Sequence, residues 1–346
     1  MNSIERFLRT AERKDVDHPA CWLGIPDESA LPLLFGHFGV KSVPQLKALL
    51  DDDLWPVELP YHSPFSNHIY SAFDFSKKGA PPVKDRTLTA PGWFEDHMSL
   101  NAVEEFPWPD PQKYISPSLC RQAVSNVPQG KATLGVLWSA HFQDTCAAFG
   151  MEQALMCLIE EPKLFQAVDE KIVDFYLRAN RIFLENTAGS LQAVLIGNDL
   201  GSQTGLIMSQ DMISRYVLPG AKRLIEQAHH YGVKVIYHSC GAVSDMFDDL
   251  VNIGVDILHP IQALAHGMEP TGLKKRFGDR VSFCGGVDAQ NLLVNGTPEM
   301  IRQKVAELRR LFPTGLIISP SHEAILSDIS PSNVEMLIRA SQGNTL

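Results

Sequence analysis

The chain has 346 residues, of which 45% are hydrophobic and 20% are charged, with 40 acidic and 30 basic side chains. The formal net charge of −10 argues against binding to nucleic acid or to an anionic membrane, because those partners select basic surfaces. The length fits either two domains of roughly 150 residues or a single α/β barrel of about 250 residues or more. We therefore expect a globular protein that binds small, weakly charged molecules or a basic protein.

The six cysteines are too sparse in this chain for a disulfide framework. No secretion signal precedes them, and no apolar run approaches the ~20 residues that a membrane-spanning helix needs. We expect a cytoplasmic location, where thiols stay reduced and are free to bind metal.

The first part of the chain carries few regular patterns. Residues 1–15 have the spacing of an amphipathic helix, and strands are expected at 20–24 and 54–59. The interval 54–130 holds 11 of the 23 prolines. This composition favours long loops and short irregular elements over a linker between independent domains.

From residue 132 onward, apolar strand-like runs alternate with helical stretches. The expected strands are 132–139, 191–196, 233–237, 256–258, 281–283 and 315–318, and the expected helices are 144–160, 162–188, 210–231, 243–253, 298–312 and 331–341. Such units form a parallel sheet that either stays open or closes. About eight strands over this length favour an α/β protein with a single TIM (β/α)8 barrel spanning 1–346, with an N-terminal helix and a loop-rich insertion at about 54–130.

Two residues of metal-binding type stand at the end of the 233–237 strand. His238 and Cys240 are two positions apart, so the alternation of a strand sends both side chains to one side. In a barrel, the carboxyl ends of the strands face the active-site mouth. Zinc binds thiolate sulfur and imidazole nitrogen, and a catalytic zinc keeps one position open. The pair indicates a zinc site, although two ordinary buried residues would give the same pattern.

Further candidate ligands follow two later strands. Cys284 comes directly after the 281–283 strand, and His322 follows the 315–318 strand. Cys284 also fits a small buried residue beside two glycines, and His322 also fits a loop histidine held by hydrogen bonds. Candidate ligands at successive strand ends are what a metal site in a barrel mouth requires.

The order of these residues resembles the uroporphyrinogen decarboxylase superfamily. The segment 198–203, with the sequence NDLGSQ, is followed by a helical stretch and by HSCG at 238–241. The resemblance is strong over 134–340 and loose over 54–130. Within the superfamily, the chain most resembles the zinc-dependent, corrinoid-linked methyltransferases.

This resemblance implies a TIM barrel that holds zinc through His238, Cys240 and a third ligand after the last strand. The third ligand is usually cysteine in the family, and His322 stands in its place here, with Cys284 as an additional candidate. The resemblance also implies methyl transfer between a small molecule, either a thiol or a methoxylated compound, and the cobalt of a corrinoid (cobalamin) carried by a partner protein. A homodimer is familiar in the superfamily.

Five other residues are weaker site candidates. Asn198 and Asp199 follow the 191–196 strand and are expected to orient a ligand histidine or the substrate, with helix capping as the alternative. Gln203 is a candidate for hydrogen bonding to substrate, and Glu323 for a general acid toward a departing alkoxide or phenoxide. Both also fit exposed loop positions. Trp22 belongs either to the core or to the wall of a substrate pocket.

Decarboxylation of a porphyrinogen is one alternative function. That substrate carries eight carboxylates, and the decarboxylases of the superfamily meet it with an arginine-bearing motif near the N-terminus. The corresponding stretch here, 19–28, has no arginine, and none occurs between Arg13 and Arg86. The acidic residues at 27–28 and 51–53 are expected to repel such a substrate. A non-catalytic barrel that binds a corrinoid protein is the second alternative.

Overall fold

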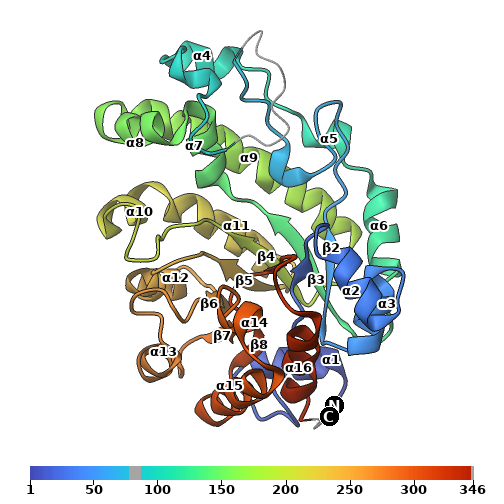
Figure 1. The fold of residues 1–346 in the computed structure, drawn as a ribbon. Coiled ribbons are helices and arrows are strands. Elements are labelled where there is room, and N and C mark those ends of the chain that lie inside the picture. The colour runs from blue at the N-terminus through green and yellow to red at the C-terminus, as the bar shows by residue number, and fades with distance from the viewer. Residues whose placement is uncertain (78–86, 344–346) are drawn as a thin grey trace.

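A curled sheet of parallel strands is the centre of the computed structural model, which describes residues 1–77 and 87–343 (Figure 1). Within those residues the sheet has seven strands in the order β2-β3-β4-β5-β6-β7-β8, so each strand lies beside the next one in the chain. The strands are β2 (Leu54–Glu58), β3 (Ala132–Trp138), β4 (Ala193–Gly197), β5 (Lys234–His238), β6 (Ile257–Ile261), β7 (Ser282–Val287) and β8 (Leu316–Pro320). The alternation of strands and helices in the sequence is therefore confirmed as an α/β fold.

The segment 20–24, expected as the first barrel strand, bonds to both edges of this sheet without forming a ladder. The N–H of Trp22 donates to the carbonyl of Ile318 in β8 at 3.0 Å. On the other side, the N–H of Cys21 donates to the carboxylate of Asp53 at 2.9 Å. The eight-stranded barrel is thus found only in part, because a side-chain carboxylate takes the place of a strand carbonyl beside β2. A two-residue pair, β1 (Ile25–Pro26) with β9 (Ala324–Ile325), continues this contact.

Two aspartates that precede β2 anchor the segment through buried ion pairs. Asp52 lies 2.6 Å from Nζ of Lys47 and accepts the N–H of Leu23 at 2.8 Å. Asp53 lies 2.5 Å from Arg6. Both aspartates are fully buried at the amino end of the sheet. The expected repulsion of a polycarboxylate by this acidic stretch is therefore wrong for Asp52 and Asp53, which face cations at the end opposite the mouth.

The α-helices of the described residues lie around the sheet and at its ends (Figure 1). They are α1 (Ser3–Ala11), α2 (Leu31–Phe38), α3 (Val43–Leu50), α4 (Leu100–Glu105), α5 (Pro111–Tyr114), α6 (Pro117–Ser125), α7 (His141–Phe149), α8 (Met151–Glu160), α9 (Pro162–Asn186), α10 (Gln210–Tyr216), α11 (Leu218–His230), α12 (Phe247–Asn252), α13 (Pro270–Phe277), α14 (Leu292–Asn295), α15 (Pro298–Leu311) and α16 (Pro331–Ser341). Among the described residues, no helix is long and apolar enough to cross a membrane.

Two helices that the sequence predicted as continuous are divided. The 144–160 stretch forms α7 and α8, which are separated by Gly150 with a φ of 89°. A Cβ on Gly150 would approach the carbonyl oxygen of Ala90 to 3.2 Å, so glycine suits both the left-handed backbone and the close contact. The 210–231 stretch forms α10 and α11, with Pro219 in the first turn of α11.

The proline-rich interval between β2 and β3 is built from short elements, as expected. Its described residues form two 3-10 helices, η1 (Ile69–Ser71) and η2 (Trp93–Glu95), and the helices α4, α5 and α6. These three α-helices pack on the long helix α9, above the sheet in Figure 1. Residues 78–86 of the interval lie outside the described residues.

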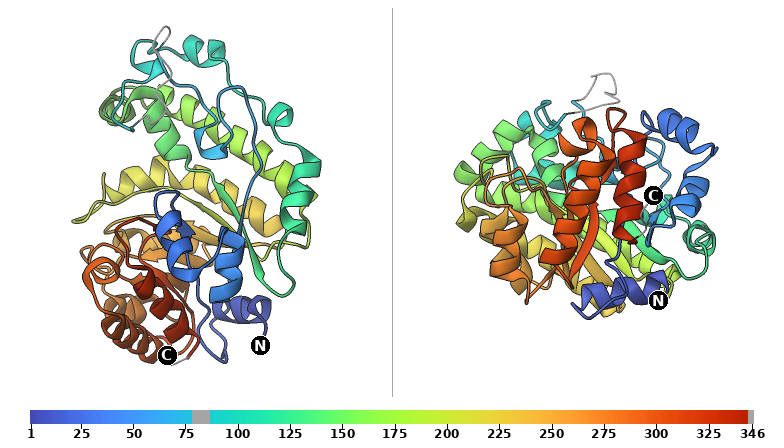
Figure 2. Two further views of the ribbon diagram at one scale, coloured as in Figure 1. Left: turned by 45° about the vertical axis from the view of Figure 1, so that its right-hand side comes forward. Right: turned by 60° about the horizontal axis from the view of Figure 1, so that its bottom comes forward.

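The space inside the curled sheet is filled by an apolar core of its own. Alternate residues of the strands point inward, among them Leu134, Leu195, Ile236 and Ile317. The N-terminal helix α1 adds Phe7 to this core at the amino ends of the strands. Figure 2 shows α1 at the same end of the molecule as both termini. The carboxyl ends of the strands are therefore the end at which polar inward residues can meet a ligand.

Candidate active site

His238 and Cys240 lie in contact at the carboxyl end of β5. Sγ of Cys240 is 3.2 Å from Nε2 of His238, and Oδ1 of Asp199 is 3.3 Å from the same nitrogen. One ligand atom from each of the three residues lies within 4.8 Å of the others. His238 is buried, whereas the side chain of Asp199 is 49% exposed. The group therefore opens to solvent on the side of Asp199.

Two interlocked loops hold Asp199 beside Cys240. The N–H of Cys240 donates to Oδ1 of Asp199 at 2.9 Å. Gly241 has a φ of 89°, and a Cβ there would lie 2.6 Å from the carbonyl carbon of Gly201. The backbones of the two loops thus approach more closely than a side chain would allow. The NDLGSQ and HSCG segments, which are far apart in sequence, form one structural unit.

The opposite nitrogen of His238 faces a second set of polar groups. Nδ1 of His238 lies 3.0 Å from Nδ1 of His259 and 3.3 Å from Oε2 of Glu323. His259 is paired in register with His238 between β5 and β6, so both rings lie at one level of the sheet. Within the described residues, Nε2 of His259 is buried without a hydrogen-bond partner. These three residues also form a group that could hold a metal ion.

His322, which follows β8, reaches the same cluster. Its ring centroid is 6.2 Å from that of His238, and its interaction with Cys240 raises the pKa of His322. Nδ1 of His322 accepts the N–H of Ala324 at 3.0 Å. The side chain is 45% exposed, whereas that of the neighbouring Glu323 is 13% exposed. His322 therefore borders the cluster on its solvent side, and Glu323 lies behind His238.

The charges of the cluster shift the pKa values of its members. Burial lowers the pKa of His238, but Glu323, Asp199 and Cys240 outweigh burial and raise it well above its usual value. Burial raises the pKa of Cys240, yet hydrogen bonds with His238 and His322 bring it below its usual value. Burial also opposes ionisation of Asp199, but His238 holds the pKa of that carboxyl well below its usual range. The environment thus favours a thiolate and a carboxylate beside one imidazole.

The atoms around Nε2 of His238 suit a zinc ion. Thiolate sulfur, imidazole nitrogen and carboxylate oxygen are the ligands that zinc binds in proteins. From typical bond lengths, the sulfur and nitrogen ligands of a tetrahedral zinc lie about 3.6 Å apart, close to the 3.2 Å between Cys240 and His238. His238, Cys240 and Asp199 can therefore hold zinc after small movements.

Cys284 lies apart from both groups of candidate ligands. Its side chain is fully buried in the inner core, and Sγ lies 3.3 Å from Oγ of Ser319. Cys284 is paired in register with Ile317, at an apolar level of the sheet. Burial raises the pKa of the thiol to about 12. Among the described residues, the structure does not bring Cys284 into a group of three or more candidate ligands.

The remaining sequence candidates lie around the cluster. Asn198 is buried, where Oδ1 accepts the N–H of Phe142 at 2.9 Å and Nδ2 donates to the hydroxyl of Tyr237 at 3.1 Å. Its amide therefore fixes the start of α7. Gln203 is exposed on the loop that follows Asp199. Trp22 is fully buried in the inner core, and its ring centroid lies 5.4 Å from that of His259.

His259 and Trp138 are not among the site residues predicted from the sequence, but both contact the cluster. His259 stands two positions after the inward residue Ile257, just as His238 stands two positions after Ile236, so strand alternation was the available signal. The ring of Trp138 lies 6.3 Å from that of His238. Trp138 has a φ of 56°, a strained conformation that often occurs at functional sites.

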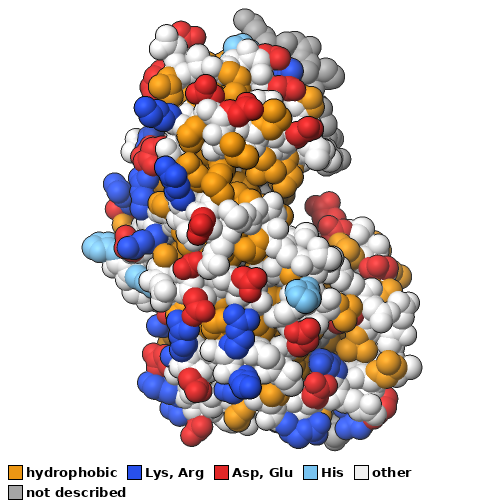
Figure 3. All heavy atoms as spheres, turned by 90° about the vertical axis from the view of Figure 1, so that its left-hand side faces the viewer, with side chains coloured by type: hydrophobic (Ala, Val, Ile, Leu, Met, Phe, Trp, Pro, Cys, Tyr) orange, Lys and Arg blue, Asp and Glu red, His pale blue; other side chains and the backbone are white. Residues whose placement is uncertain are grey.

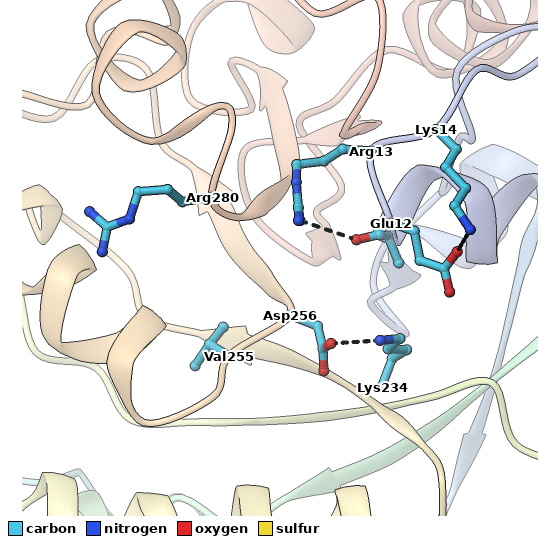
Figure 4. A pocket seen from close by; sticks show the side chains of 8 residues that line it. Glu12, Arg13, Lys14, Lys234, Val255, Asp256 and Arg280 are labelled. Atoms are coloured by element: carbon cyan, nitrogen blue, oxygen red, sulfur yellow. Dashed lines mark hydrogen bonds and ion pairs between the residues drawn. The ribbon is translucent and has the colours of Figure 1, made fainter.

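Two hollows on the surface differ in character. The face in Figure 3 is hollowed below the region of α7 and α8, and apolar side chains gather there. Another hollow of about 410 Å³ lies at the amino ends of the strands (Figure 4). Charged side chains line this second hollow, and Lys14 and Lys234 are paired there with Glu12 and Asp256. It lies at the end of the sheet opposite His238.

Comparisons with known proteins agree with this fold. A family model described as uroporphyrinogen decarboxylase matches residues 89–343. A solved structure of a methyltransferase from Methanosarcina mazei has a TM-score of 0.71 at 15% identity, covering 99% of both chains. A B12-independent methionine synthase from Shewanella sp. W3-18-1 has a TM-score of 0.44 at 9% identity, covering 66% of this chain and 65% of that one. No curated protein matches the sequence. Because the family model spans nearly three quarters of the chain, the protein belongs to the uroporphyrinogen decarboxylase family.

Proposed function

We propose that the protein is a zinc-containing methyltransferase that moves a methyl group between a small molecule and the cobalt of a corrinoid on a partner protein. The observation that carries the proposal is the contact of Cys240, His238 and Asp199 at the carboxyl ends of the strands. Decarboxylation does not need a thiolate and an imidazole that share one metal. The fold shared along the full chain with a methyltransferase from Methanosarcina mazei supports the same activity.

Bound zinc would supply a Lewis acid that ionises a substrate thiol or draws electrons from an ether oxygen. We propose His238 and Cys240 as two of its ligands, supported by the sequence pattern and by the 3.2 Å contact between Sγ and Nε2. His322 and Cys284 complete the ligand set predicted from sequence. In the transfer, the bond from the methyl carbon to its donor atom breaks with the electron pair left on that atom, while the acceptor provides the pair for the new bond.

The residues around the zinc ligands orient His238 and shape access to it. Glu323 and His259 face Nδ1 of His238, so Nε2 is the nitrogen that meets Cys240 and Asp199. A carboxylate or other acceptor at the far nitrogen of a ligand histidine is the usual arrangement in metal sites. The low exposure of Glu323 supports this orienting role over that of a general acid for a leaving group.

The substrate of the proposed reaction is a small thiol or a methoxylated compound, with an oxygen leaving group favoured if two imidazoles and one thiolate form the site. A porphyrinogen with eight carboxylates is disfavoured, because the N-terminal stretch between Arg13 and Arg86 offers no arginine to bind it. The apolar hollow in Figure 3 suits weakly charged molecules better than a polycarboxylate.

We place this activity in the cytoplasm, in a single barrel unit spanning 1–346 with an insertion at about 54–130. A corrinoid protein is the proposed macromolecular partner, and a homodimer is the proposed assembly. Neither nucleic acid nor a membrane is a proposed partner, in keeping with the net charge of −10.

Metal analysis followed by a methyl-transfer assay tests the proposal. We expect about one zinc per purified chain, lost in Cys240→Ala, and methylation or demethylation of cob(I)alamin with a thiol or a methoxylated compound. Full activity in protein stripped of transition metals would contradict the methyltransferase. A zinc-loaded protein that binds a corrinoid protein but transfers no methyl group would favour the non-catalytic barrel. Release of carbon dioxide from a porphyrinogen would favour the decarboxylase.

A further inference from the structure

We infer that Asp199 is the third protein ligand of the proposed zinc site, and that His322 donates a hydrogen bond to the Cys240 thiolate instead of binding the metal. This inference rests on the proposed zinc site and assigns its ligands residue by residue. It departs from the ligand set that the sequence suggested, in which His322 held the third position.

The two histidines of the cluster differ in the hydrogen bonding of their far nitrogens. Nδ1 of His322 accepts the backbone N–H of Ala324 at 3.0 Å. A neutral imidazole with an accepting Nδ1 carries its proton on Nε2. That nitrogen then has no lone pair for a metal. Its N–H is available to donate to the sulfur of Cys240, and hydrogen bonding from His322 is one cause of the lowered pKa of that thiol.

His238 has the opposite arrangement. Its Nδ1 faces the carboxylate of Glu323 at 3.3 Å and the ring of His259 at 3.0 Å, both of which can accept a proton. With the proton on Nδ1, the lone pair of Nε2 points to the side of Cys240 and Asp199. This is the pattern expected of a metal-bound histidine, whose other nitrogen donates to a carboxylate or carbonyl.

Asp199 supplies the missing third atom. Its Oδ1 lies 3.3 Å from Nε2 of His238 and accepts the N–H of Cys240, so it is fixed beside both ligands. When His238 keeps its proton on Nδ1 only, a sulfur, a nitrogen and an oxygen, each with a lone pair, face one point, where a zinc ion takes the place of the proton on Nε2. The exposed side of Asp199 and the N–H of His322 border the remaining position, as a catalytic zinc with one open site requires.

Zinc affinity of matched variants of the full chain tests the assignment, measured by competition with a chromogenic chelator. Asp199→Asn keeps an oxygen for the N–H of Cys240 but loses the charged ligand, and we expect its zinc affinity to fall by more than about 100-fold. A loss of this size exceeds the roughly 10- to 100-fold loss that is typical when a residue contacts a metal ligand but not the metal. His322→Gln keeps an N–H donor, and we expect its affinity to fall by less than the roughly 10-fold lower limit for residues that contact a metal ligand. Cys240→Ala provides the reference for a lost ligand.

Cobalt substitution adds a readout that does not depend on activity. We expect Co²⁺-loaded His322→Gln to keep the thiolate charge-transfer band and the strong d–d absorption of a four-coordinate site, and Asp199→Asn to lose that intensity. Weak zinc binding by His322→Gln, or near-normal binding by Asp199→Asn, would overturn the assignment, as would a wild type that binds no zinc. Normal zinc binding by the wild type without methyl transfer would overturn only the proposed function.

Discussion

Two clusters of buried charged side chains lie at opposite ends of the sheet, and they differ in how their hydrogen bonds are satisfied. At the amino end, Asp52 and Asp53 face Lys47 and Arg6 and also accept backbone N–H groups of the segment 20–24. At the carboxyl end, the carboxylates of Asp199 and Glu323 and the thiol of Cys240 all lie next to the single ring of His238. The first arrangement stabilises the fold, and the second is suited to bind a cation.

The amino-end cluster replaces a missing strand ladder. The carboxylates of Asp52 and Asp53 take the N–H groups of Leu23 and Cys21, which would otherwise pair with carbonyls of β2. Each carboxylate is in turn neutralised by a cation at 2.5 to 2.6 Å. The attraction within a buried ion pair and its additional hydrogen bonds offset the desolvation cost of the charges, whereas removal of one partner leaves that cost uncompensated.

The carboxyl-end cluster lacks this balance. Within the described residues, Nε2 of His259 and Nε1 of Trp22 are buried without a hydrogen-bond partner. Asp199, Cys240 and Glu323 all face the ring of His238, and His322 is a second imidazole next to Cys240 and Glu323. Buried polar groups without partners cost stability, so their presence at one place points to a functional role.

The largest expected effect comes from breaking the amino-end pairs. Asp52→Asn leaves the ammonium of Lys47 buried without a counter-charge, and we expect the free energy of unfolding in urea to fall by about 3–5 kcal/mol. The double variant Asp52→Asn/Lys47→Met should recover most of this loss, because no unpaired charge remains. A loss below about 1 kcal/mol in the single variant would show that the pair does not hold the segment 20–24.

At the carboxyl end, a comparable substitution is expected to act on metal binding and not on stability. Cys240→Ala should weaken zinc binding by more than about 100-fold, which corresponds to about 2.7 kcal/mol. In the presence of a chelator, the same variant should unfold at a temperature equal to or above that of the wild type, because one acceptor next to Asp199 is gone. Marked destabilisation of the chelated variant would place Cys240 among the structural residues.

A smaller effect on zinc affinity is expected from Glu323, which lies next to Nδ1 of His238. Glu323→Gln should lower zinc affinity by about 10- to 100-fold, as is usual for residues that orient a metal-bound histidine. Titration with a chelator measures this change, and the exposed variant Glu307→Gln serves as the control. A general acid would give a different result, namely unchanged zinc affinity with strongly reduced methyl transfer from a methoxylated compound.

Most of the sheet could be predicted from the sequence because its strands are short apolar runs between glycine or proline residues. The starts of β5, β7 and β8 fall within one residue of the expected positions. The pairing of the segment 20–24 could not be predicted in this way, because its N–H groups bond to the side chains of Asp52 and Asp53, which are distant in sequence. The proline-rich interval gave no periodic signal from which α4, α5 and α6 could be bounded.

The candidate site was predictable where one strand carries the signal, and not where several strands share it. His238 is the last residue of β5 and Cys240 follows two positions later, so continuing the alternation of the strand predicts both side chains on one side. The position of His259 depends on the register between β5 and β6, which the sequence does not specify. Cys284 also follows an apolar run, but β7 continues beyond it to Val287. Cys284 is therefore paired with the buried, apolar Ile317 of β8 and lies below the carboxyl end of the sheet.

The smallest expected effect concerns a third polar cluster, between α7 and α9, and the dependence of stability on pH. Burial raises the pKa of Asp144 to about 7, although the hydroxyl of Tyr176 donates to the carboxylate at 2.5 Å. Between about pH 4 and 7 the unfolded chain is ionised at this residue and the folded chain stays protonated, so stability falls as pH rises through this window and levels off above it. Asp144→Asn, which cannot ionise, should gain about 1–3 kcal/mol over the wild type at pH 8 relative to pH 5 in urea unfolding. The exposed Asp211→Asn should show no such gain, and equal pH profiles for Asp144→Asn and the wild type would mean that this carboxyl is ionised in the fold.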